Sequence, residues 1–156
     1  MPTNNLHDPK QILNTSRSFL MAAQRCAEKR DNPAANSVSF LVAPAVVNAA
    51  FSCELSIKAI LSYYKISFPR GNSGHKIGCL FSHLPNELQA KIKMTVNTPD
   101  FCSNLQMISN SFVEWRYLFE QDSASIPLTF LMLLAQALYQ EAETLIDESS
   151  IAHKQF

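Results

Sequence analysis

Apolar side chains recur along most of this chain at the spacing of an α-helix with one buried face. The clearest run begins at Phe101 and advances in alternating steps of four and three residues. That is the period of a helix whose apolar stripe faces a core. The run comprises Phe101, Leu105, Ile108, Phe112, Trp115 and Phe119. We therefore predict one long helix here, capped by residues 98–100 and buried along this stripe.

Start and stop signals predict the other helices. Asp8 before Pro9 combines a capping carboxylate with a proline at the first helical position, and this helix continues to about Lys29. Further helices are predicted from Val38 to Ile66, from about His75 to His83, from Pro85 to about Val96 and from Pro127 to about Glu148. Together they predict an all-α fold, an up-and-down helical bundle of four long helices plus one or two short helices. We expect a single domain over residues 1–156, with frayed tails at 1–7 and 151–156.

Composition supports a helical, core-rich protein. Hydrophobic residues make up 47% and charged residues 17% of the chain, which is typical of a globular domain. The three glycines are Gly71, Gly74 and Gly78, so the rest of the chain has little need of left-handed turns. This favours long helices over a hairpin-rich β fold. The formal net charge is zero, so no global charge draws the chain toward nucleic acid.

Cysteines and apolar runs bear on localisation and cofactors. The four cysteines are far apart and form no Cys-x-x-Cys pair, which favours free thiols in a reducing cytoplasm. The N-terminus lacks the apolar run of a signal peptide. Val38–Phe51 and Ile126–Tyr139 are shorter than the roughly 20 residues of a spanning helix, so we predict core helices and no membrane partner. No residue spacing indicates a metal or another cofactor.

Two charged residues fall on or beside apolar helix faces. Glu54 lies inside a stripe of the second helical region, where a carboxylate must be paired, hydrogen-bonded or protonated. Lys58 follows one turn later and could pair with it. Arg116 lies at the edge of the tryptophan stripe, and we hypothesise that it meets Glu54 across the bundle. Three alternatives stay open for Arg116: a structural pair, a ligand or catalytic role, and exposure to solvent.

Three segments carry recognisable motifs: residues 53–61, with Glu54 and Lys58 one turn apart, residues 74–81, which begin Gly-His and end Leu-Phe, and residues 112–120, which read Phe-x-x-Trp-Arg-Tyr-x-x-Glu. In this order they resemble the Glu-x-x-x-Lys helix, the Gly-His-aliphatic-x-x-Leu-Phe segment and the Phe-x-x-Trp-Arg-Tyr-x-x-Glu segment of the HEPN domains (higher eukaryotes and prokaryotes nucleotide-binding). The resemblance implies a helical bundle that is commonly dimeric. It also implies a relation to toxins and antiphage proteins, many of which cut RNA without a metal through an Arg-x4-6-His motif.

The chain departs from that motif at the expected helix. Arg116 is followed by Tyr117, and residues 121–123 occupy the positions where histidine would fall. The one formal match is Arg70 and His75, with four residues between them, in the glycine-containing loop. The candidate catalytic residues are therefore Arg116, His75 and Arg70.

We interpret the chain first as a HEPN-like binding or regulatory module without catalysis. The alternative from another class is a metal-independent endoribonuclease that uses Arg116, or Arg70 with His75. A third is a nucleotide-binding bundle in which indole and guanidinium faces stack on bases. The predicted binding residues are Trp115, Arg116, Tyr117, Glu54, Lys58 and Glu120. We expect a homodimer, and RNA, a nucleotide or a partner protein as the ligand.

Overall fold

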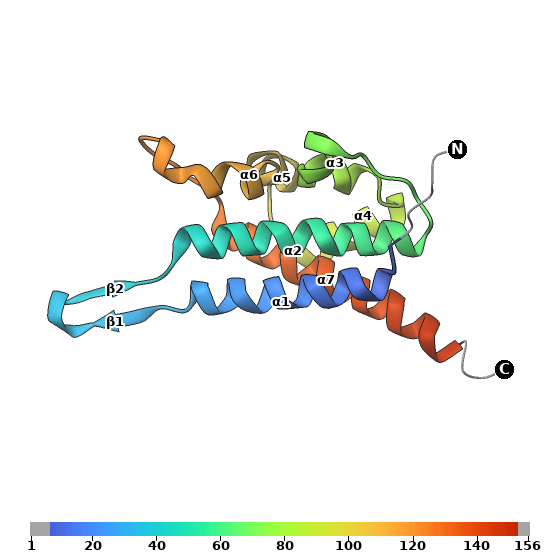
Figure 1. Ribbon diagram of the computed structural model, residues 1–156, viewed down its shortest axis with the longest axis horizontal. Coiled ribbons are helices and arrows are strands. Elements are labelled where there is room, and N and C mark those ends of the chain that lie inside the picture. Colours follow the sequence, from blue (N-terminus) through green and yellow to red (C-terminus); the bar gives the residue numbers. More distant parts are fainter. Residues whose placement is uncertain (1–6, 153–156) are drawn as a thin grey trace.

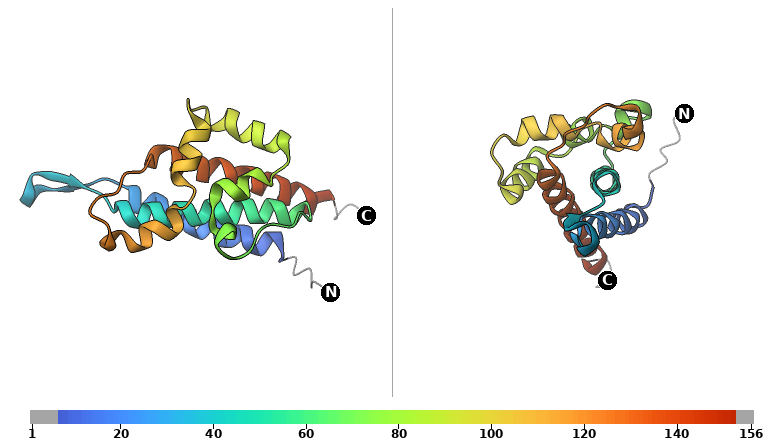
Figure 2. Two further views of the ribbon diagram at one scale, coloured as in Figure 1. Left: turned by 90° about the horizontal axis from the view of Figure 1, so that it is seen from above. Right: turned by 90° about the vertical axis from the view of Figure 1, so that its left-hand side faces the viewer.

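Three long helices form the centre of the molecule. In the computed structural model, which describes residues 7–152 and the side chains of residues 7–148, these are α1 (Pro9–Ala27), α2 (Val42–Tyr63) and α7 (Leu128–Ala152). Each contacts the other two, and α1 and α2 run antiparallel side by side (Figure 1). Seen end-on, the three helices surround one core (Figure 2). The all-α prediction is confirmed.

Local signals account for the helix starts. The Asp8 carboxylate accepts a hydrogen bond from the backbone N–H of Lys10 at 2.9 Å, so the predicted cap of α1 is confirmed. Pro44 lies in the first turn of α2, where the N–H that proline lacks would have no helical acceptor. Helix α7 continues through Ala152, past its predicted end. The predicted frayed tails lie largely outside the described residues.

A small hairpin joins α1 to α2. Strands β1 (Arg30–Asn32) and β2 (Ser37–Ser39) pair antiparallel around a 3₁₀ turn, η1 (Pro33–Ala35). Asn36 supplies the left-handed residue that the turn needs, at φ 48°. The hairpin projects from the end of the bundle (Figure 1). The second helix therefore begins at Val42, not at Val38 as predicted.

A layer of short elements covers one side of α2. It comprises η2 (Gly71–His75), α3 (Ile77–Ser82), α4 (Asn86–Val96), α5 (Phe101–Ile108), α6 (Ser111–Glu114) and η3 (Trp115–Glu120). Of these, α3, α6 and η3 contact α2, whereas α4 contacts α7. The layer brings the glycine-containing loop and the tryptophan segment to the same side of α2 (Figure 1).

The predicted long helix around Trp115 is divided into three parts, so that prediction is wrong. The first break falls at Ser109 and Asn110, between α5 and α6. The second break begins at Trp115, where the chain changes to 3₁₀ winding with a non-helical Tyr117 at φ −110° and ψ 30°. The apolar stripe therefore stays buried only as far as Trp115, and Phe119 is 80% exposed.

Helix α2 is the most apolar of the three long helices. By length and composition alone it could cross a membrane, but 72% of its most apolar window is buried inside the bundle. This burial supports the prediction of a core helix for residues 42–51, whereas the predicted start at Val38 is wrong because residues 38–41 precede α2 and Val38 and Leu41 are exposed.

Candidate functional site

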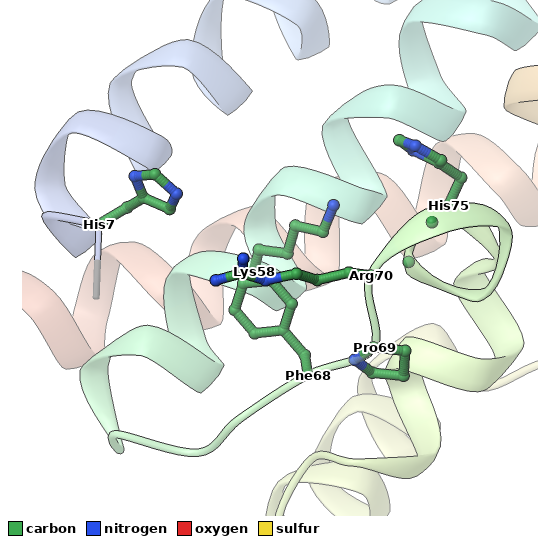
Figure 3. A pocket seen from close by; sticks show the side chains of 8 residues that line it. His7, Lys58, Phe68, Pro69, Arg70 and His75 are labelled. Atoms are coloured by element: carbon green, nitrogen blue, oxygen red, sulfur yellow. The ribbon is translucent and has the colours of Figure 1, made fainter. Parts of the chain in front are cut away.

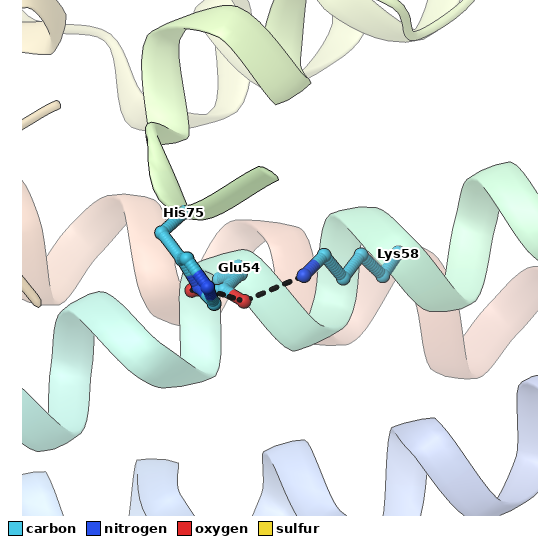
Figure 4. Close-up of polar contacts among 3 residues, drawn as sticks. All are labelled: Glu54, Lys58 and His75. Atoms are coloured by element: carbon cyan, nitrogen blue, oxygen red, sulfur yellow. Dashed lines mark hydrogen bonds and ion pairs between the residues drawn. The ribbon is translucent and has the colours of Figure 1, made fainter. Parts of the chain in front are cut away.

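The buried carboxylate of Glu54 organises a polar cluster on α2. Its side chain is 1% exposed, and it accepts a hydrogen bond from Lys58 Nζ at 2.7 Å. His75 Nδ1 lies 3.1 Å from Oε1 and 3.3 Å from Oε2 of the same carboxylate. Figure 4 shows Glu54 between the two basic side chains. The prediction that Glu54 must be paired is confirmed, and Lys58 is one of its two partners.

This geometry selects one form of the imidazole. A carboxylate only accepts hydrogen bonds, so Nδ1 of His75 must carry the hydrogen. In the neutral ring Nε2 is then free to accept a proton or a hydrogen bond. The His75 side chain is 44% exposed, so the ring is reachable from solvent while Glu54 fixes its orientation. A buried carboxylate that orients a histidine in this way is a common arrangement at functional sites.

Two glycines shape the loop that carries His75. Gly71 has φ +65°, which favours glycine, and a Cβ at Gly74 would lie 2.6 Å from the carbonyl oxygen of Pro69. The loop therefore folds back closely on itself before α3. This turn explains two of the three glycines, and a Cβ at the third, Gly78, would lie 3.0 Å from the hydroxyl oxygen of Ser109.

The start of α3 is held by the break between α5 and α6. The backbone N–H of Ile77 donates to the carbonyl oxygen of Ser109 at 2.9 Å. The N–H of Gly78 donates to the hydroxyl oxygen of Ser109, also at 2.9 Å. These bonds give partners to amides in the first turn of a helix, which have none within it. They also place His75 relative to the tryptophan segment.

A pocket of about 330 Å³ opens beside this cluster (Figure 3). Among the described residues that line it, every titratable side chain is basic. The full lining is His7, Lys58, Phe68, Pro69, Arg70, Gly71, Gly74 and His75. Lys58 Nζ lies 5.6 Å from the centre of the Phe68 ring, an additional favourable contact for its charge. The pocket therefore presents positive and neutral basic groups to any ligand.

Arg70 is the cation of this pocket with the most freedom to bind a ligand. Lys58 is already paired with Glu54. Arg70 forms no ion pair with any residue that the structure describes. Its guanidinium keeps its full charge at any physiological pH and can donate two parallel hydrogen bonds to a phosphate.

Arg116 does not pair with Glu54, so that hypothesis is wrong. Its side chain is exposed, and its guanidinium carbon lies 4.5 Å from the centre of the Phe112 ring. The reason is the 3₁₀ winding after Trp115, which turns Arg116 away from the buried face. The Phe112 ring also lies 6.0 Å from the His75 ring and is stacked on Phe51 at 4.6 Å. Phe112 thus connects Arg116 to the His75 cluster.

The remaining predicted binding residues are divided between core and surface. Trp115 is 9% exposed and belongs to the core. Tyr117 is 48% exposed, and Glu120 is exposed as well. His7 falls at the end of the predicted frayed tail 1–7, but it lines the pocket. Only the path of the folded chain brings it there, because no sequence pattern links residue 7 to residue 70.

One thiol of the chain is part of the core. Cys53 is fully buried on α2, and this burial raises the pKa of its thiol well above the ordinary range. All four cysteines are free, as predicted. In residues 7–152, no group of three or more His, Cys, Asp or Glu side chains is placed to hold a metal ion.

No protein-family model, curated protein or solved structure matches this chain.

Proposed function

We propose that the chain is a HEPN-like binding module that takes a phosphate-bearing ligand, RNA or a nucleotide, in the basic pocket. One observation carries this proposal: Lys58, Arg70, His75 and His7 line one cavity, and Glu54, the one carboxylate among the described residues that pairs with any of them, is buried. A phosphate in the pocket would meet donors without meeting an exposed negative charge.

Each pocket residue has a distinct part in this proposal. Arg70 grips two phosphate oxygens. Lys58 adds a weaker attraction because Glu54 neutralises much of its charge at short range. His75 donates or accepts a hydrogen bond according to its protonation. The volume, about 330 Å³, is at the small end of ligand pockets, so it suits one phosphate group with its sugar more than a whole dinucleotide.

The test is a titration of a fluorescently labelled single-stranded RNA, read as polarisation at two salt concentrations. Arg70→Ala should weaken binding about tenfold or more and flatten the salt dependence, because a phosphate contact and its released counterion are lost. Arg25→Ala is the matched control, since Arg25 is 78% exposed at the far end of α1 and its ion pair is with Glu28. Equal binding by Arg70→Ala and the parent chain would contradict the proposal.

A second candidate is metal-independent cleavage of RNA by Arg70 and His75. The observation that favours it is the hydrogen bond between Nδ1 of His75 and the Glu54 carboxylate. Because this bond occupies Nδ1, Nε2 is free to act as a general base. Nε2 would take the proton of a ribose 2′-hydroxyl, and that oxygen would attack the neighbouring phosphorus. The 5′-oxygen would leave, taking a proton from solvent, so the products are a 2′,3′-cyclic phosphate and a 5′-hydroxyl end. Arg70 would hold the phosphate charge throughout.

An RNA-cleavage assay in excess chelator, run beside the binding titration, separates catalysis from binding. His75→Ala should abolish cleavage while leaving most of the binding, if the chain is an enzyme. His83→Ala is the matched control, because His83 Nδ1 lies 2.8 Å from the Cys79 carbonyl oxygen at the end of α3 and His83 does not line the pocket. Absence of any cleavage by the parent chain would leave binding as the function.

A further inference from the structure

Two aromatic side chains on η3 face solvent although most of the large apolar residues of the chain are buried. Tyr117 is 48% and Phe119 is 80% exposed, and their ring centres lie 6.4 Å apart. The Arg116 guanidinium lies 5.7 Å from the centre of the Tyr117 ring. The six residues of η3 therefore expose two aromatic rings and one guanidinium group to solvent.

A continuous series of side-chain contacts links these rings to the basic pocket. The ring centres of His75 and Phe112 lie 6.0 Å apart. The guanidinium carbon of Arg116 lies 4.5 Å from the centre of the Phe112 ring. Arg116 in turn contacts Tyr117. Figure 1 shows the short elements that carry these residues on the same side of α2. A ligand held by its phosphate beside His75 could therefore extend toward η3.

We propose that Tyr117 and Phe119, with Arg116 beside them, form a stacking platform for the unpaired bases of a single-stranded RNA. This inference rests on the proposed function, since the phosphate of that strand lies in the Arg70–His75 pocket. Bases stack on aromatic rings and on guanidinium planes whatever their identity, so the platform binds without strong sequence preference. Duplex RNA is excluded because its bases are already stacked and paired inside the helix.

The Arg116 guanidinium and the basic pocket, and not the net charge of η3, favour nucleic acid over a protein partner at this surface. The platform combines aromatic rings with an exposed arginine and is linked through Phe112 and His75 to a pocket whose titratable groups are basic. Exposed aliphatic side chains, which a protein interface would also use, gather elsewhere, on Val38 and Leu41 near the hairpin.

Acidic residues that follow Phe119 limit the length of the RNA strand that η3 can bind. Glu120 follows Phe119 directly and is exposed, and Asp122 is exposed two residues later. These carboxylates repel phosphate, so the bases of the strand contact the platform while its phosphate backbone turns away from Glu120 and Asp122. The bound RNA strand is therefore short. Neutralising Glu120 should therefore tighten RNA binding.

The experiment compares three ligands: AMP, a single-stranded RNA of about six nucleotides, and a duplex of the same length. The variant Tyr117→Ala/Phe119→Ala should bind the single strand about tenfold or more weakly and bind AMP as the parent does. Tyr117→Phe should restore part of the loss, because the ring and not the hydroxyl is needed. Glu120→Gln should bind the single strand severalfold more tightly, with less change for AMP.

The outcomes separate this inference from the proposed function. If Arg70→Ala weakens AMP binding but the aromatic variant binds the single strand as the parent does, the platform is wrong and the pocket stands. If Arg70→Ala changes the affinity for neither AMP nor the single strand, both the platform and the pocket are wrong. If the aromatic variant instead converts a dimer to a monomer at unchanged RNA affinity, η3 is a protein interface and the platform is overturned.

Discussion

Replacement of Lys58 by methionine tests whether Glu54 is a buried charge that depends on its neighbours. Methionine keeps most of the aliphatic length of lysine, so the main change is the loss of the ammonium group. Lys58 Nζ lies 2.7 Å from Glu54 Oε1, and the two side chains are 18% and 1% exposed. At an effective dielectric constant of about 20, Coulomb's law gives a gross attraction of about 6 kcal/mol at that separation.

The net effect must be smaller than this gross attraction. Desolvation of both ions offsets much of it, and removal of one partner from a buried pair destabilises proteins by about 3–5 kcal/mol. His75 still contacts Glu54 in the variant and Lys58 is partly exposed in the parent, so we expect the lower end, about 3 kcal/mol. For a chain of this length that corresponds to a fall in Tm of about 6–12 °C.

The assay is urea unfolding followed by far-ultraviolet circular dichroism at pH 8. The double variant Glu54→Gln/Lys58→Met removes both charges and should recover much of the lost free energy of unfolding.

Lys91→Met is the matched control for this comparison. Lys91 Nζ lies at the same separation, 2.7 Å, from Glu141 Oε2, but the lysine is 58% exposed. Its loss should destabilise by about 1 kcal/mol or less. If Lys58→Met destabilises no more than Lys91→Met at pH 8, Glu54 is not a buried carboxylate held by Lys58, and the organisation of the pocket described above is refuted.

The other predictions concern the loop, the oligomer and the outer face of α7. Gly74→Ala should destabilise by about 1–3 kcal/mol in urea unfolding and weaken AMP binding, because its Cβ would meet the Pro69 carbonyl oxygen at 2.6 Å; unchanged stability would contradict the loop geometry. We expect a dimer through Leu41, which is 62% exposed, and its neighbours. Leu41→Glu should therefore give a monomer by light scattering, and a monomeric parent chain would contradict this expectation. Burial and the hydrogen bond to Glu143 raise the pKa of Tyr139 to about 12. The native state then holds this proton more tightly than the unfolded state, so stability should fall as pH rises from 10 to 12, and Tyr139→Phe should reduce that slope.

The part of the site on α2 could be predicted from the sequence because it depends on helical spacing alone. Glu54 interrupts an apolar stripe, and Lys58 is one turn away on the same face. Both predictions hold in the structure. The second partner, His75, lies 21 positions from Glu54 and reaches it only through the folded loop. Periodicity carries no information about such a contact.

The tryptophan segment shows where the same reasoning fails. The apolar spacing continues from Phe101 to Phe119 without interruption, so it predicts one helix. The polar run Ser109–Asn110–Ser111 was the signal for a break, because serine and asparagine compete for backbone hydrogen bonds. Tertiary bonds from α3 to Ser109 then make the break favourable. As a result Arg116 faces solvent, and its expected pairing with Glu54 is lost.

The most direct test of the basic pocket is a two-dimensional ¹H–¹⁵N NMR titration of the parent chain with AMP. Binding at the pocket predicts chemical-shift changes concentrated on the backbone amides of Gly71–His75 and around Lys58, and their loss in Arg70→Ala. No shift change at millimolar AMP, or changes confined to residues outside this pocket, would contradict its assignment as the ligand site.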